Sequence, residues 1–75
     1  LVVHCKSAER EDEILELLRK ATRRHRVKSR NWTEKGMDYV FEIVIKETKT
    51  LVSAMEKSEN VERFSLMEYD SDDIL

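Results

Sequence analysis

Apolar residues recur along the chain at two spacings, and the changes of spacing divide it into alternating strands and helices. Residues 1–5 form a short apolar run that is rich in β-branched side chains and typical of a strand. From residue 8 onward, apolar positions recur every three or four residues, which predicts a helix with Ser7 as its N-cap. The apolar stripe of this helix consists of Ile14, Leu17, Leu18 and Ala21.

The pattern returns to a period of two in the middle of the chain. A strand is expected over residues 26–32, followed by a turn whose Gly36, the only glycine, tolerates positive φ. The next strand, 39–46, directs one apolar set toward the helices, namely Tyr39, Phe41, Ile43 and Ile45. Helical spacing over residues 48–57 predicts a second helix, and Asn60 is expected to form a left-handed exit after it. Renewed alternation over 61–69 predicts a fourth strand.

The predicted element order is β-α-β-β-α-β, which indicates an α+β ferredoxin-like fold. Right-handed crossovers then give one four-stranded antiparallel sheet with two helices on one face. We expect a single domain over residues 1–69 and a solvated acidic tail over 70–75. On the expected register the helix-free face carries the candidate interface residues Val2, Val40, Val44 and Met67. The same face is expected to carry His4, Glu42 and some of Lys28, Arg30 and Trp32. Trp32 itself is expected to pack over the edge of the sheet, and its alternative interpretation is an aromatic residue that binds a ligand or partner.

Composition excludes several classes of site. The single cysteine allows neither an internal disulfide nor a multi-cysteine metal site, and His4 and His25 lie on different elements. We therefore expect no metal and no cofactor, with Cys5 a small buried apolar residue and His4 a surface residue of its strand. No spacing suggests a nucleophile with its base, and one glycine cannot build a phosphate loop, so the chain is not expected to be an enzyme.

Single-stranded RNA binding is also not expected, although the RNA-recognition domain has the same topology. That domain presents outward aromatic residues after a basic residue and a glycine. Here Met37 and Asp38 follow Lys35-Gly36, and the first strand contains no aromatic residue. We therefore predict no nucleic-acid partner.

The net charge of −2 conceals an uneven distribution, because residues 1–18 carry −3, residues 19–35 carry +7 and residues 36–75 carry −6. The basic segment is a candidate site for an anionic ligand, lipid headgroups or an acidic partner. The alternative interpretation is structural. The basic residues at the end of the helix interact favourably with the helix dipole, and those on the edge strand prevent that strand from pairing with other chains. The candidate residues are Arg19, Arg23, Arg24, Arg26, Lys28 and Arg30.

Three stretches of the chain carry a resemblance to a protein family. They are Val27-Lys28-Ser29-Arg30-Asn31, then Gly36 with Tyr39-Val40-Phe41-Glu42-Ile43, and then Asn60-Val61-Glu62-Arg63-Phe64-Ser65-Leu66 with Glu68-Tyr69-Asp70. They resemble the cytosolic C-terminal domain of small bacterial multi-span membrane proteins, uncharacterised families similar in layout to the MgtC/SapB type. The resemblance implies an ACT-like regulatory or assembly domain on the cytoplasmic side of the membrane. The glycine-rich ligand loop of ACT domains is absent at residues 6–9.

Two functional hypotheses follow. The first is a non-enzymatic regulatory or assembly domain, the soluble cytosolic part of a longer membrane-anchored protein, which forms a homodimer through its sheet. The start of the chain inside an apolar run, without methionine, motivates the expectation of a longer polypeptide. The alternative is a sensing domain for a small ligand, such as an anion, a nucleotide or an amino acid, bound at the basic segment.

Overall fold

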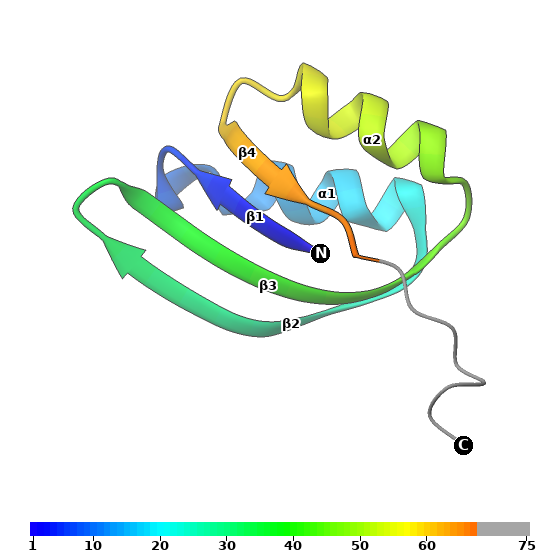
Figure 1. Cartoon of the computed structure of the whole chain (residues 1–75), viewed down its shortest axis with the longest axis horizontal. Helices are drawn as coiled ribbons and strands as arrows, with labels where there is room; N and C mark the ends of the chain where they lie inside the picture. The colour runs from blue at the N-terminus through cyan, green and yellow to red at the C-terminus, as the bar shows by residue number, and fades with distance from the viewer. Residues whose placement is uncertain (68–75) are drawn as a thin grey trace.

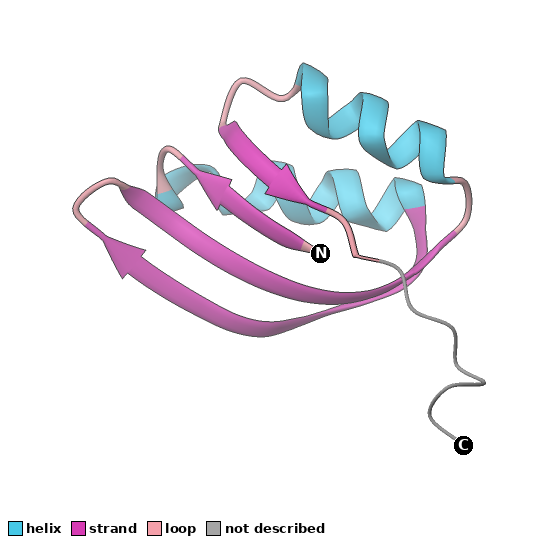
Figure 2. Cartoon of the chain, viewed as in Figure 1, coloured by secondary structure: helices cyan, strands magenta, loops and turns pink. Residues whose placement is uncertain are grey.

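The computed structural model describes residues 1–67 and contains one four-stranded antiparallel sheet with both helices packed on one face (Figure 1). The sheet has the strand order β2-β3-β1-β4, so the short first strand lies in its interior. The elements are β1 (Val2–Cys5), a 3-10 turn (Ala8–Arg10), α1 (Glu11–Ala21), β2 (Thr22–Thr33), β3 (Gly36–Ile45), α2 (Thr48–Lys57) and β4 (Val61–Ser65), as Figure 2 shows. This arrangement confirms the predicted ferredoxin-like α+β fold. Residues 68 and 69 of the predicted domain, and the predicted tail at 70–75, lie outside the described residues.

Several element boundaries differ from the sequence prediction, and β3 begins at Gly36 where a start at Tyr39 was expected. The second strand begins at Thr22, immediately after α1, because buried Thr22 leaves the helical conformation while its hydroxyl donates to the Leu18 carbonyl at 2.5 Å. The first helix begins at Glu11 and not at residue 8, and Ser7 caps the preceding 3-10 turn by accepting the Glu9 N–H at 3.1 Å. The last strand ends at Ser65. Charged residues lie at these ends, so no apolar periodicity in the sequence indicated where the elements begin or end.

The core lies between the sheet and the two helices, as the alternation in the third strand predicted. Tyr39 and Phe41 are buried and stack with their ring centroids 5.3 Å apart. Cys5 is fully buried, which confirms its expected role as a small apolar residue. Buried side chains from every layer complete the core: Val3, Ile14, Leu18, Ala21, Met37, Leu51 and Met55.

Asn60 corrects a further prediction. No non-glycine residue of the described chain has a positive φ, so Asn60 does not form the expected left-handed exit. Its side chain is buried, accepts the Ser7 N–H at 3.1 Å and donates to the Ser7 carbonyl at 3.3 Å. The Asn60 amide thus supplies hydrogen-bond partners for the backbone N–H and C=O of Ser7, and it joins the loop after β1 to the turn before β4.

The buried Tyr39 hydroxyl has no hydrogen-bond partner among the described residues. Burial, with the nearby Glu11 carboxylate, raises the pKa of Tyr39 to about 12 from its ordinary value of 10. Because the neutral phenol is favoured in the folded state, its contribution to stability is complete below pH 10 and is lost as pH rises through 12. Between pH 9 and pH 12, the parent protein should therefore lose about 2 kcal/mol more of its unfolding free energy than the Tyr39→Phe variant loses.

Urea denaturation of both proteins at several pH values between 8 and 12 measures this difference. Cys5, whose pKa burial raises to about 11, titrates in both proteins, so the difference between them reports Tyr39 and its electrostatic coupling to Cys5. At pH 8 the phenylalanine variant should be as stable as the parent or slightly more stable, because it buries no unpaired hydroxyl. Identical pH dependence of the two proteins would contradict this account of Tyr39.

Candidate functional site

The pairing register determines which side chains lie on the helix-free face. Val2 lies opposite Val40, and His4 lies opposite Asp38 in the pairing of β1 with β3. Since Val3 and Tyr39 between them are buried in the core, these two pairs point away from the helices. The face therefore has an apolar middle around Val2 and Val40 and a charged end around His4.

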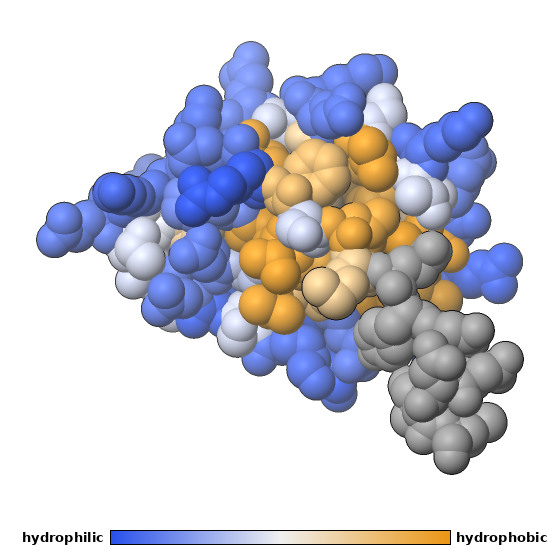
Figure 3. Space-filling model, viewed as in Figure 1, coloured by the Kyte–Doolittle hydropathy of each residue, from blue (hydrophilic) through white to orange (hydrophobic). Residues whose placement is uncertain are grey.

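The predicted apolar residues of this face are brought together by the structure. Their side chains are exposed by 47% at Val2, 37% at Val40, 43% at Val44 and 77% at Met67. Figure 3 shows an apolar patch in the middle of the molecule with hydrophilic residues around it. The same residues lie along a groove of about 760 Å³ between β3 and the end of β4. A contiguous exposed apolar surface of this kind is a candidate site of interaction.

The six predicted basic residues do not form one site. Arg19 lies on α1 and pairs with Glu16 at 2.5 Å, whereas Arg26 and Lys28 of β2 both contact Glu42 on the helix-free face, at 3.1 and 3.5 Å. Arg24 pairs with Val44 in the register and so lies on the same face. Arg23 falls in a register shift of β2 and is exposed. The basic residues are thus spread over both sides of the sheet.

A second register shift in β2, between Val27 and Ser29, corrects the predicted face of two residues. Lys28 is the extra residue, so the following positions change sides relative to simple alternation. Arg30 pairs with Tyr39 and reaches Glu11 of α1 at 2.6 Å, which places it on the helix side. Trp32, opposite buried Met37, also belongs to that side, and at 66% exposure it does not pack over the sheet edge as expected.

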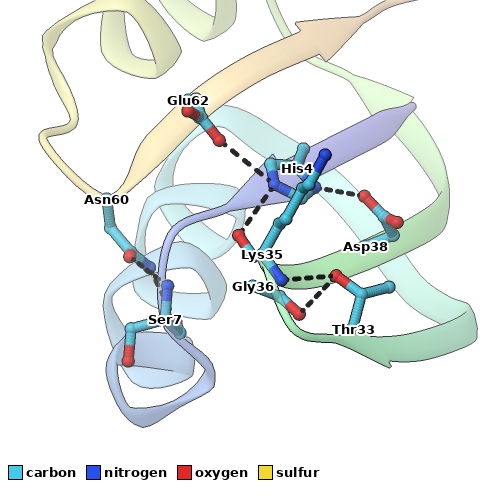
Figure 4. A network of polar contacts seen from close by, with 8 residues as sticks. All are labelled: His4, Ser7, Thr33, Lys35, Gly36, Asp38, Asn60 and Glu62. Carbon is cyan, nitrogen blue, oxygen red and sulfur yellow. Dashed lines mark hydrogen bonds and ion pairs between the residues drawn. The ribbon is translucent and has the colours of Figure 1, made fainter.

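His4 lies at the centre of a polar cluster that the sequence prediction missed. Its Nδ1 contacts the Asp38 carboxylate, and its Nε2 lies 3.1 Å from Glu62 Oε2 and 3.2 Å from the Lys35 carbonyl (Figure 4). All three partners are acceptors, with Nδ1 facing Asp38 and Nε2 facing both Glu62 and the Lys35 carbonyl. His4 is only 5% exposed, so the prediction of a surface residue is wrong.

A bulge in β4 explains why Glu62 reaches His4. Cys5 pairs with Val61 and His4 pairs with Arg63, so Glu62 is the additional residue between two regular pairs. Without the bulge, Glu62 would occupy the core-facing position opposite Cys5. The one signal in the sequence was a lone polar residue, His4, within the apolar run at residues 1–5.

The His4 cluster borders a shallow pocket of about 400 Å³ that is also lined by Arg63 and the β2–β3 turn. Charges of both signs line it, and both ring nitrogens of His4 are already occupied by partners within the protein. Over residues 1–67, no group of three or more His, Cys, Asp or Glu side chains is arranged to hold a metal ion. The cluster therefore joins three strands and the turn, and nothing in its geometry assigns it a nucleophile or a free base.

Comparisons of the chain with family models, with curated proteins and with solved structures found no match. The family resemblance drawn from the sequence therefore stays a prediction. None of the helices within residues 1–67 is both long enough and apolar enough to cross a membrane.

Proposed function

We propose that the chain is a non-enzymatic assembly or regulatory domain that self-associates through the helix-free face of its sheet. The observation that carries this proposal is the exposed patch of Val2, Val40, Val44 and Met67. Val2 lies on β1, Val40 and Val44 lie on β3, and Met67 follows the end of β4; all four line one groove. Covering such a surface with a second copy removes apolar area from water, at roughly 25 cal/mol per Å² buried.

The two edges of the sheet are less suited to pairing with another copy. The β2 edge carries Arg23, Arg24, Arg26, Lys28 and Arg30, and charge on an edge strand opposes pairing with a like edge. The opposite edge, β4, has only five residues and contains a bulge. Face-to-face packing is therefore favoured over growth of the sheet at its edges.

The ligand-sensing alternative receives less support. It requires the basic residues to converge on one ligand, yet Arg19 and Arg30 lie on the helix side while Arg26 and Lys28 lie on the other face. Each of these four also contacts a glutamate, with Arg26 and Lys28 sharing Glu42. A thermal-shift screen would still detect such a ligand, because one present at 100 times its dissociation constant stabilises the protein by about 2.7 kcal/mol.

The membrane context of the proposal rests only on the resemblance to cytosolic domains of multi-span membrane proteins. We propose on that ground that the domain acts on the cytoplasmic side of a membrane as part of a longer chain. The reading frame upstream of Leu1 tests this part of the proposal. Several apolar stretches of about 20 residues would support it, and an upstream sequence without any would overturn it.

Self-association is tested by light scattering after size-exclusion chromatography over a range of protein concentrations. We expect the parent protein to shift from monomer toward dimer as concentration rises to about 1 mM, and Val40→Arg or Val44→Arg to weaken the dimer by at least about tenfold. Ser53→Arg is the matched control, because Ser53 is exposed on α2, away from the patch. A parent protein that stays monomeric throughout, or a dimer that all three variants leave unchanged, would contradict the proposal.

A further inference from the structure

The outer edge of β2 is the longer of the two edges of the sheet. β2 has twelve residues and lies at one end of the strand order, as Figure 1 shows, whereas β4 at the other end has five. Within residues 1–67, only β3 pairs with β2. Leu1 exchanges hydrogen bonds with Phe41 of β3, so a continuation of β1 before Leu1 would run beside β3 and not beside this edge.

Backbone groups of Arg30 and Trp32 point outward at this edge. Phe41 directs its N–H and C=O toward Leu1, and hydrogen-bonding directions alternate along a strand. The residues of β3 that alternate with Phe41 therefore face β2, and among them is the partner of Asn31. The residues on both sides of Asn31 direct their N–H and C=O away from β3. Two donors and two acceptors are thus available to a further strand.

The edge carries an excess of positive charge. Its five basic side chains, which are those of β2 named above, contact only two carboxylates within residues 1–67, those of Glu11 and Glu42. Arg23 and Arg24 have no ion-pair partner in that part of the chain, and both are exposed. Such an edge repels a second copy of itself and attracts a chain of negative charge.

Trp32 adds an apolar position on the helix side of the same edge. The side chain is 66% exposed, because no helix covers it there. Val27 lies on the same side and is half-buried against the core. A strand added beside β2 would cover both side chains with apolar residues. Its alternate side chains would meet Arg24, Arg26 and Lys28 on the helix-free face.

A nucleic-acid strand fits these features less well than a peptide does. Within residues 1–67 the helix-free face offers no exposed aromatic side chain for base stacking, because Tyr39 and Phe41 are buried and Trp32 lies on the helix side. A sugar–phosphate backbone also lacks the N–H donors that the outward carbonyls of Arg30 and Trp32 require.

We propose that the outer edge of β2 binds an acidic, extended segment of a partner protein, which adds to the sheet as a fifth strand antiparallel to β2. The segment places one apolar residue beside Trp32 and another beside Val27. Its acidic residues lie on the helix-free side, beside Lys28, Arg26 and Arg24. The exposed apolar patch takes no part in this contact, so the proposal does not rest on self-association.

A synthetic peptide and the tryptophan fluorescence of the intact chain test the proposal. The acetylated and amidated peptide Ile-Glu-Thr-Glu-Val-Glu-Thr-Glu aligns its isoleucine with Trp32 and its valine with Val27. Trp32 is the only tryptophan of the chain, so its emission reports on this edge. We expect a saturable shift of the emission to shorter wavelength, together with slower hydrogen exchange of the Arg30 and Trp32 amides.

Backbone methylation separates strand pairing from nonspecific attraction between charges. The amide of the first threonine faces the Arg30 carbonyl, so its N-methylation should weaken binding at least about tenfold. The amide of the preceding glutamate points away from β2. N-methylation of that glutamate is therefore the matched control, which keeps the same charge and should leave binding unchanged.

Charge variants test the expected sign of the partner. Arg24→Glu breaks no ion pair of residues 1–67 and should weaken binding by about tenfold, and a peptide with lysine in place of its glutamates should also bind at least about tenfold more weakly. Arg19→Glu is the matched control, since it makes the same change of charge on α1 and should leave binding unchanged. Far-ultraviolet circular dichroism verifies that both variants fold.

Three results would overturn the proposal. The first is the absence of saturable binding. The second is equal binding of the glutamate and lysine peptides, or of the two methylated peptides. The third is an oligouridylate strand with the same number of charges that binds as tightly as the peptide and shifts the Trp32 emission equally, because the edge would then recognise nucleic acid.

Discussion

Replacing Gly36 with alanine is expected to lower the free energy of unfolding by about 4 kcal/mol or more. Gly36 has a φ of 131° and is the only residue with positive φ in the described chain. A Cβ at this position would lie 2.1 Å from the backbone carbonyl oxygen of Cys5 and 3.0 Å from that of Lys6. Since these atoms belong to the backbone at the end of β1, relief requires β1 and β3 to separate.

A loss of this size is comparable to the whole stability of a domain of this length, roughly 4 to 11 kcal/mol. The variant should therefore be largely unfolded at 37 °C, as circular dichroism and urea titration would measure. Lys35→Ala is the matched control, because it changes an exposed side chain one residue earlier and keeps the glycine. A cost below about 1 kcal/mol for Gly36→Ala would mean that the strands do not approach each other as described.

Replacing His4 with leucine is expected to lower the free energy of unfolding by about 2 kcal/mol. The ring lies between the Asp38 and Glu62 carboxylates, so its removal leaves both carboxylates without their partner in the cluster. The carbonyl of Lys35 also loses its partner in the β2–β3 turn. The partial exposure of both carboxylates keeps the cost below that of a fully buried ion pair.

A double-mutant cycle distinguishes this interaction from a simple loss of packing. Asp38→Asn with Glu62→Gln removes the charges, and His4→Leu made in that background should cost at least about 1 kcal/mol less than in the parent. Urea denaturation of the four proteins at pH 7 gives the coupling energy. If His4→Leu costs the same in both backgrounds, the polar cluster does not stabilise the fold.

Much of the fold could be predicted from apolar periodicity, because that periodicity is what packing requires. Tyr39, Phe41 and Ile43 alternate in the sequence and do face the helices in the structure. The turn at Gly36 was likewise predictable, because the only glycine lies where the chain reverses. The second helix was predicted at its observed bounds, Thr48–Lys57.

The errors concern places where tertiary contacts override local pattern. A bulge at Lys28 reverses the faces of Arg30 and Trp32, and a bulge at Glu62 turns that side chain toward His4. Neither bulge can be recognised from the sequence, because the inserted residues, Lys28 and Glu62, are charged like the residues at most exposed positions. The exposure of Val2 and Val40 on the helix-free face was predicted correctly because these residues lie where both strands pair regularly.

The central claim, that the helix-free face joins two copies of the chain, is tested most directly by nuclear magnetic resonance on a mixed sample. One half of the protein carries 13C-labelled valine and methionine methyl groups, the other half is unlabelled, and filtered experiments detect only contacts between copies. We predict intermolecular contacts from the methyl groups of Val2, Val40, Val44 and Met67. Intermolecular contacts confined to α1 and α2, or none at concentrations near 1 mM, where even weak dimers are populated, would contradict the claim.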